Sequence, residues 1–307
     1  MDQVHALYDS QSLPLGSPVA TYAKEMKVRV PASSANLGPG FDALAVALSI
    51  YIEVGVEPAD ELSLTTSGYG SEISDPDSHL AVSLVRQILG HDRVALSVHS
   101  EIPLARGLGS SAALAVAVAA AAGHPAPLDI GVAVDGHAEN AAASLLGGLV
   151  TASVDDDGVF VQQLPLDEAL RFVVVIPERE LATADARAVL PASVSYHDAA
   201  FNLSRVAALT AGLADHRRLV ATAMDDRLHQ PYRMDLLPFA RDVLSTMREA
   251  GALASCWSGA GSTMLAVTTA ESAQSIVSAA QSVLSQHGEP GVVRTVDADR
   301  RGVTTVS

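Results

Sequence analysis

The sequence predicts an α+β fold. Segments typical of strands and segments typical of helices are mixed along the chain without the regular alternation of a doubly wound parallel sheet. Of the 307 residues, 49% are hydrophobic, which is enough for a sizeable core in one large domain or two smaller ones. The chain has no internal repeat and no low-complexity linker, so a repeat array is excluded.

The first half supplies strands and helices around one glycine-rich turn. Residues 1–25 mix Pro, Gly and Ser without a clear period and are expected to form a tail. Met26 begins MKVRVP, whose alternation predicts a strand. After it we expect strands at 50–57, 61–66 and 93–99, a helix at 77–89, a helix from Ala112, a loop at 123–128 and a helix at 137–146.

The second half continues the same mixture. The β-branched run in RFVVVIP predicts a buried strand. We expect strands at 148–154, 158–163, 171–176, 252–257, 263–268 and 291–297, and helices at 197–213, 216–228, 238–250 and 271–287.

Charge and cysteine content restrict the partners and the compartment. The formal charge is −16, from 35 acidic and 19 basic residues, so the surface repels nucleic acid and anionic membranes, and we expect neither as a partner. The single cysteine, Cys256, allows no internal disulfide and fits a reducing compartment. The first residues, MDQVHALYDSQ, lack the pattern of a signal peptide. We therefore expect a soluble, cytoplasmic protein.

Lysine is nearly absent. Lys24 and Lys27 are the only two lysines in the chain, and both precede every motif. A Walker A loop, a protein-kinase lysine and an internal Schiff-base lysine are therefore excluded. Any chemistry with ATP must use backbone amides, a helix dipole, serines, arginines and a metal ion.

The segment LARGLGSSAALAVAVAAAA, residues 104–122, predicts an anion site. Gly107 and Gly109 can take backbone angles closed to other residues, so that successive N–H groups point into one concavity. Ser110 and Ser111 stand where a helix begins, and its positive dipole end favours a phosphate. One alternative is an ordinary capped core helix. Another is the dinucleotide fingerprint G-x-G-x-x-A, but EIPLAR replaces the strand that it requires.

Two further segments carry polar side chains at turns. In PASSANLGPGFD the glycines and Pro39 fix a tight turn, and we expect Asn36 and Asp42 to face a common space; a plain polar turn is the alternative. In DGHAEN, Asp135 and His137 precede an alanine-rich helix. A zinc deaminase is excluded because its second motif needs two cysteines. A carboxylate binding Mg²⁺ and a capped helix start both remain open.

The segment SGAGST, residues 258–263, lies between two apolar strands. The segment is compatible with a plain hairpin turn and with a glycine-lined wall that a ligand approaches closely. Cys256 beside it fits an ordinary core position.

Together and in this order, the four segments resemble the homoserine kinases, a family of the GHMP small-molecule kinases. PASSANLGPGFD resembles the first motif of that family, PLARGLGSSAA the ATP loop of the superfamily, SGAGST its third motif, and DGHAEN its E-G-H-P-D-N segment. TADARAVLP and HQPYRMDLLP stand where the family carries its substrate arginines. The resemblance extends from about residue 26 to the end of the chain.

The resemblance implies a two-domain GHMP kinase fold. Residues 26–165 would form an N-terminal ATP-binding domain like domain 2 of ribosomal protein S5, with a left-handed β-α-β unit around the ATP loop. Residues 166–307 would form a ferredoxin-like C-terminal domain, and residues 1–25 a disordered tail.

The implied activity is phosphoryl transfer from ATP to the side-chain hydroxyl of L-homoserine, with Mg²⁺, in threonine biosynthesis. The residues expected to bind ATP are Pro103, Leu104, Ala105, Arg106, Gly107, Leu108, Gly109, Ser110, Ser111, Ala112 and Ala113. A homodimer remains open.

The same resemblance assigns the substrate and metal residues. Homoserine is a zwitterion, so its carboxylate would pair with the forks of Arg187 and Arg233 and its ammonium with Asp42. Ser110 and Asp135 would hold Mg²⁺ and, with Asn140, act in catalysis. We assign no general base, because phosphoryl transfer through a loose transition state needs alignment and charge neutralisation more than a strong base. Asn140 is preferred to Glu139 as the group that orients the substrate hydroxyl. The complete set expected at the substrate is Asn36, Asp42, His137, Asn140, Arg187, Arg233 and Gly261.

The chain departs from the family pattern at several positions. Asp135 replaces a glutamate, which shortens the side chain by one methylene. The other departures are Ala45 for glycine, Ala138 for proline, Glu139 for aspartate and Ser262 for proline. A GHMP kinase for another alcohol, such as shikimate or mevalonate, is one alternative, and a non-catalytic nucleotide-binding descendant is another.

Overall fold

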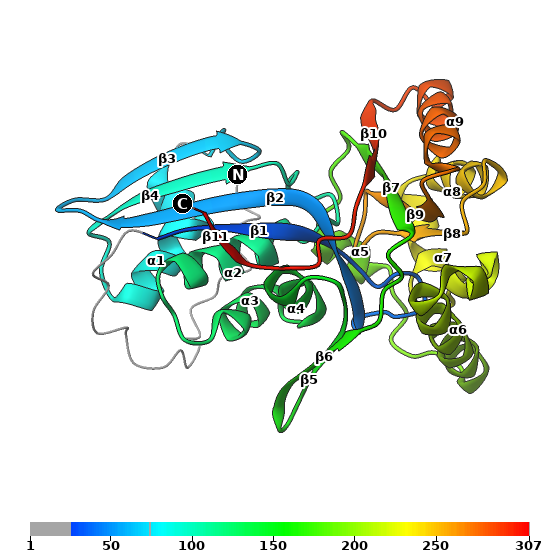
Figure 1. The fold of residues 1–307 in the computed structure, drawn as a ribbon, viewed down its shortest axis with the longest axis horizontal. Helices are drawn as coiled ribbons and strands as arrows, with labels where there is room; N and C mark the ends of the chain where they lie inside the picture. Colours follow the sequence, from blue (N-terminus) through cyan, green and yellow to red (C-terminus); the bar gives the residue numbers. More distant parts are fainter. Residues whose placement is uncertain (1–25, 74, 307) are drawn as a thin grey trace.

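The structure, a computed structural model, describes residues 26–73 and 75–306. The tail expected at residues 1–25 lies outside this range. Two β-sheets lie side by side, each covered by helices, and the first is formed mainly by the first half of the chain (Figure 1). The expected α+β class is confirmed.

The first sheet has seven strands, in the order β11-β1-β2-β4-β3, with β5 paired to β2 and to β6. Its neighbouring strands run antiparallel except β3 and β4, which run parallel. The strands are β1 (Met26–Ala35), β2 (Leu44–Pro58), β3 (Ser63–Gly68), β4 (Val94–Ser100), β5 (Leu149–Asp155), β6 (Gly158–Leu164) and β11 (Thr304–Val306).

β1 and β2 extend several residues beyond their expected bounds, both toward the turn that joins them. β1 continues through Ser33 and Ser34, after a register shift between Pro31 and Ala32. β2 begins at residue 44, because residues 44–48 are buried throughout and give an unbroken apolar run instead of an alternating one. The tight turn is therefore confined to residues 36–43.

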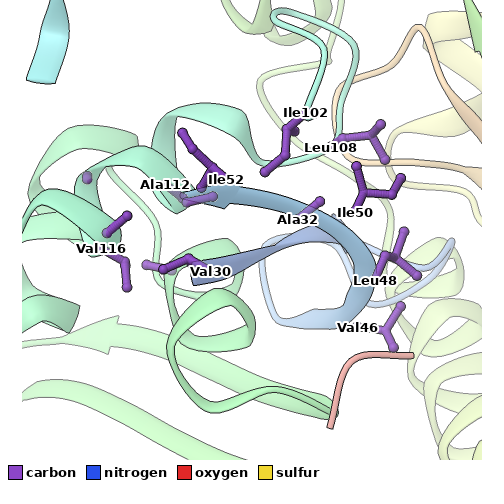
Figure 2. Close-up of a cluster of buried hydrophobic side chains, with 14 of the residues drawn as sticks. Val30, Ala32, Val46, Leu48, Ile50, Ile52, Ile102, Leu108, Ala112 and Val116 are labelled. Carbon is purple, nitrogen blue, oxygen red and sulfur yellow. The ribbon is translucent and has the colours of Figure 1, made fainter. Parts of the chain in front are cut away.

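Helices cover one face of the first sheet: η2 (Pro76–Ser78), α1 (Leu80–Leu89), α2 (Ser110–Ala121), α3 (Pro127–Asp135) and α4 (Glu139–Leu146). α2 is apolar all round because it lies among α1, α3, α4 and the strands β1 and β2. Its alanines let these neighbours approach closely, and Figure 2 shows Ala112 and Val116 near the side chains of β1 and β2. α3 was not expected, since its proline-rich start indicates a loop; Pro127 in fact occupies its first turn, where proline is tolerated.

The second sheet has the order β10-β7-β9-β8, all antiparallel. Its elements are β7 (Leu170–Pro177), α8 (Ala240–Glu249), β8 (Ala254–Trp257), β9 (Met264–Thr269), α9 (Ala273–Gln286) and β10 (Gly291–Val296). This succession, strand-helix-strand-strand-helix-strand, is the ferredoxin-like pattern that was expected.

A long insertion between β7 and α8 carries the elements α5 (Thr183–Ala188), α6 (Tyr196–Ala214), η3 (His216–Arg218), η4 (Ala221–Met224), α7 (Gln230–Arg233) and η5 (Met234–Leu236). The single helix expected at 216–228 is wrong. The Asp215 and Asp226 carboxylates accept bonds from backbone N–H groups of residues 217 and 228–230, and such bonds compete with a continuous helix.

The C-terminal end of the chain returns to the first sheet. β11 pairs with β1, although the expected domain division assigns residues 304–306 to the second domain. The strand was not expected because three residues give no periodic signal. Within residues 26–73 and 75–306, no helix combines the length and apolar character needed to cross a bilayer.

Candidate active site

A glycine turn links β4 to α2. Gly107 has a φ of 70° and Gly109 a φ of 65°, both in the left-handed region. A Cβ on Gly107 would lie 2.2 Å from the Ser258 carbonyl oxygen, and one on Gly109 would lie 2.3 Å from Ser33 Oγ. Both positions therefore require glycine for backbone conformation and for close approach.

The start of α2 is open to solvent. Gly107, Gly109 and Ser110 are partly exposed and Ser111 is exposed. Gly109 is the N-cap and has no side chain to satisfy the first N–H groups of the helix. Neither serine hydroxyl makes a hydrogen bond to the described part of the chain. The turn thus presents unoccupied donors at a positive helix end, which suits a phosphate.

The SGAGST segment contacts this turn directly. The Ser34 hydroxyl donates to Ser258 Oγ over 2.8 Å, and the Ser258 hydroxyl donates to the Gly107 carbonyl over 2.8 Å. Thr263 N–H donates to the Arg106 carbonyl at 3.1 Å. Gly261, expected near the substrate, packs against Gly107: a Cβ on Gly107 would lie 2.7 Å from Gly261 N. The segment therefore supports the glycine turn.

The Arg106 side chain is bonded to residues outside the glycine turn. Its guanidinium donates to the carbonyls of Leu104, Pro177 and Glu178 and pairs with the Glu180 carboxylate at 2.8 Å. These contacts tie the turn to the end of β7. Arg106 is one of the residues expected to bind ATP, but its guanidinium is occupied by these contacts within the protein.

Asn140 lies between β1 and the turn. Its Oδ1 accepts a bond of 2.8 Å from the Ser33 hydroxyl, and a Cβ on Gly109 would lie 2.9 Å from the same oxygen. Asn140 is 8% exposed and stands in the first turn of α4. The amide is thus held next to the start of α2.

Asn36 organises the turn that follows β1. Its Nδ2 donates to the Gly259 carbonyl at 2.9 Å, and its Oδ1 accepts from Asp42 N–H at 3.0 Å. The expected common space is thus built by the Asn36 amide, which supports the backbone of Asp42 and leaves the Asp42 carboxylate free to reach outward.

The Asp42 carboxylate pairs with Arg187 of α5. Arg187 donates from both terminal nitrogens, to Asp42 Oδ1 at 2.7 Å and to Oδ2 at 3.1 Å. The two side chains are 33% and 38% exposed, so the pair stands at the surface of the site. The sequence assigns these groups to opposite ends of one ligand, and the structure brings them together.

Arg233 of α7 lies deeper, at 1% exposure. Its guanidinium donates to the carbonyls of Ala186 and Gly259, at 3.1 and 3.0 Å, and to His229 Nδ1 at 3.0 Å. The Phe41 ring faces both arginines, with 5.5 Å from its centroid to Arg187 Cζ and 5.6 Å to Arg233 Cζ. Burial, with repulsion from Arg187, lowers the pKa of Arg233 to about 10, so it stays charged at neutral pH.

His137, Glu139 and Asp135 form an acidic corner beside this set. His137 Nδ1 lies 2.8 Å from Glu139 Oε1, and Glu139 Oε2 is buried with no hydrogen-bond partner among the described residues. The pKa of Asp135 is raised to about 6, mainly by burial and also by the Glu139 charge, while His137 and Arg187 oppose the rise. Burial lowers the pKa of His137, but Glu139, Asp135 and Asp42 outweigh it and the net shift is upward. Glu139, to which Asn140 was preferred, is thus a buried carboxyl group beside the other members of the site.

Similar proteins identify the chain. A model described as "GHMP kinases N terminal domain" matches residues 79–148, and one described as "GHMP kinases C terminal" matches residues 207–286. A homoserine kinase of Moorella thermoacetica is 42% identical over 255 residues, which cover 78% of this chain and 86% of that protein. The chain belongs to the homoserine kinase family of the GHMP kinases. A homoserine kinase of Microchaete diplosiphon is 36% identical, over 91% of this chain and 97% of that protein. The crystal structure of homoserine kinase from Cytophaga hutchinsonii superposes on this structure with a TM-score of 0.81. The two are 27% identical, and the match covers 95% of this chain and 100% of that one.

Three residues beside the site of this homoserine kinase family member were not predicted from the sequence: Phe41, His229 and Asp226. Phe41 lies in PASSANLGPGFD, and His229 lies in HQPYR, where the sequence indicated a role for the arginine only. Asp226 carries no motif signal. Each acts through a contact with a distant segment, which only the folded chain reveals.

The buried His229 predicts loss of stability in acid. Burial lowers its pKa to about 4; Asp226 and Asp42 oppose this shift and Arg233 adds to it. Below pH 6.5 the unfolded chain takes up a proton that the folded chain refuses, so the free energy of unfolding should fall by up to about 1.4 kcal/mol per pH unit between pH 6.5 and 4. Urea unfolding at several pH values measures this, and His229→Asn should reduce the slope. An identical slope in the variant would contradict the assignment.

Proposed function

We propose that this protein transfers the γ-phosphoryl group of ATP to the side-chain hydroxyl of L-homoserine, a step toward threonine. The observation that carries the proposal is the convergence of an amide-lined phosphate turn with one carboxylate and two arginines. These charges match a zwitterion. The single cysteine fits a cytoplasmic setting for this reaction.

Substrate would enter by exchanging partners in the Asp42–Arg187 pair. Its ammonium would take the Asp42 carboxylate, and its carboxylate would take Arg187 and Arg233. A compound that lacks either charge leaves one member of the pair without a partner, which is costly in a half-buried site. The pair therefore favours an amino acid over a simple alcohol or acid.

The oxygen donors of the site suit Mg²⁺. Ser110 and Asp135 would hold the ion, and the buried, unpartnered Glu139 Oε2 adds negative charge that a cation would offset. When bound, Mg²⁺ neutralises charge on the phosphates.

The chain's own residues align the reactants. The α2 amides hold the triphosphate, and Asn140, beside Gly109, orients the homoserine hydroxyl. The bond from this oxygen to the γ-phosphorus forms as the bond to the β-phosphate oxygen breaks, and ADP and a proton are released. The proximity of the two subsites supplies the rate advantage.

A coupled assay of ADP release tests the proposal. Homoserine, shikimate and mevalonate are compared with ATP and Mg²⁺, and product is identified by phosphorus NMR. We expect turnover with homoserine alone. Turnover with shikimate or mevalonate only would indicate a different GHMP kinase, and no turnover with any of the three would indicate a non-catalytic nucleotide-binding protein.

A further inference from the structure

We infer that His229 is a positioning residue of the homoserine site, whose neutral ring fixes the Arg233 guanidinium relative to the Gly38–Asp42 turn. This inference rests on the proposed function and identifies how one of its substrate groups is held.

The two ring nitrogens have different partners, and these fix the tautomer. His229 Nε2 lies 2.7 Å from the Gly38 carbonyl oxygen, which can only accept, so Nε2 carries the hydrogen. Nδ1 lies 3.0 Å from a terminal nitrogen of Arg233, which can only donate, so Nδ1 presents its lone pair. The ring thus bridges the first motif and the substrate arginine, and it does so only in the neutral form.

The backbone of His229 is fixed by Asp226. One carboxylate oxygen of Asp226 accepts from the N–H groups of His229 and Gln230, at 3.0 and 2.6 Å. The other accepts from the side chain of Asn202 at 2.8 Å, and Asn202 also donates to the Pro39 carbonyl at 3.2 Å. Two successive carbonyls of the Gly38–Asp42 turn are therefore bonded, that of Gly38 to His229, which precedes α7, and that of Pro39 to Asn202 of α6.

The same ring also sets the aromatic wall of the site. His229 stacks on Phe41 with 5.1 Å between ring centroids and 25° between planes. Phe41 in turn faces the guanidinium groups of Arg187 and Arg233. Rotation of the histidine would thus displace Arg233 and Phe41 together.

His229 has no free atom with which to act on the reacting groups. Its side chain is 0% exposed and both nitrogens are engaged. An effect of this residue must therefore be transmitted through Arg233 and Phe41. We expect it on the KM for homoserine and not on kcat or the KM for ATP.

Two substitutions separate the two ring contacts. In His229→Asn the side-chain oxygen falls near the position of Nδ1 and can accept from Arg233. In His229→Gln the side-chain nitrogen falls near Nε2 and can donate to the Gly38 carbonyl, but Arg233 loses its acceptor. We expect the KM for homoserine to rise about 10-fold or more in His229→Gln, consistent with loss of a bond to a charged group, and clearly less in His229→Asn.

His79 provides a matched control. It is also a buried histidine, at 5% exposure, but it caps α1 away from the site, and asparagine is a good cap. His79→Asn should leave all three kinetic constants within about 2-fold of wild type, a change smaller than one ordinary hydrogen bond. Wild-type KM for homoserine in both His229 variants, or an equal rise in the KM for ATP, would overturn the inference while leaving the proposed function intact. A wild-type protein that does not phosphorylate homoserine would overturn the proposed function.

A spectroscopic measurement keeps the inference testable if the variants do not fold. Nitrogen NMR of histidine-labelled wild-type protein at neutral pH should show His229 with a protonated Nε2 and an unprotonated Nδ1. The opposite tautomer, or a doubly protonated ring, would overturn the inference.

Discussion

Replacing Arg233 by alanine should raise the KM for homoserine about 10- to 100-fold, the loss expected for charge-assisted bonds of about 1.5–3 kcal/mol. The guanidinium is 1% exposed and is held by two carbonyls and His229. Its removal takes one of two positive charges from the proposed carboxylate site and deprives His229 Nδ1 and the Ala186 carbonyl of the donor they share, while the Gly259 carbonyl keeps its bond from Asn36. Steady-state kinetics with homoserine varied at saturating ATP measures the effect.

Two further variants define what the change means. Arg233→Lys keeps the charge but loses the planar fork, so we expect a smaller rise in KM for homoserine. Arg217→Ala removes an exposed arginine that pairs with Asp215 on the surface, and its kinetics should match wild type. If Arg233→Ala weakened ATP as much as homoserine, the residue would not belong to the amino acid site.

Replacing Gly107 by alanine should reduce kcat/KM for ATP about 100-fold, the order of loss caused by an ångström-scale misplacement of reacting groups. The new Cβ would lie 2.2 Å from the Ser258 carbonyl oxygen and 2.7 Å from Gly261 N, which are backbone atoms of the supporting segment. Either the turn or that segment must move, and the amides of the turn then no longer converge on the phosphates. Homoserine binding, measured by calorimetry, should change little.

Gly123→Ala is the matched control for this change. Gly123 has a φ of 72°, close to the 70° of Gly107, but a Cβ there meets nothing within 4 Å. It therefore carries the same backbone strain, about 1–2 kcal/mol, without the collision. Its kinetics should remain those of wild type although its melting temperature falls. Equal kinetic losses in both variants would show that strain, and not the position of the turn, accounts for the Gly107 effect.

The sequence predicted the segments of the candidate site better than the contacts of their side chains. The four motifs and the two arginines do converge, because each motif stands at an element boundary that local chemistry specifies: Gly109 before α2, Asp135 before Gly136, Ser258 after β8. The partners of the individual side chains were not predictable. Asp42 pairs with Arg187, which is 145 positions away, and the Arg106 guanidinium donates to carbonyls more than 70 positions away.

Secondary structure shows the same division. The buried strand β7 and the long helix α6 were both expected within a few residues of their ends, and for β7 the signal is its β-branched apolar run. The helix predicted at 216–228 does not form as one helix, because the carboxylates of Asp215 and Asp226 accept hydrogen bonds from backbone N–H groups at its two ends. β11 has three residues and exists only because β1 offers it an edge.

By itself the sequence determined the fold class, the position of the glycine turn before α2 and the types of side chain that lie around it. Glycine φ angles, helix starts and apolar periodicity are local properties, so a short window of residues fixes them. The tertiary structure alone decided that Asp42 pairs with Arg187, that Glu139 is buried, and that His229 holds Arg233. Those choices depend on burial and on distances between segments far apart in the chain, and a charged group selects its partner only after folding has removed it from water.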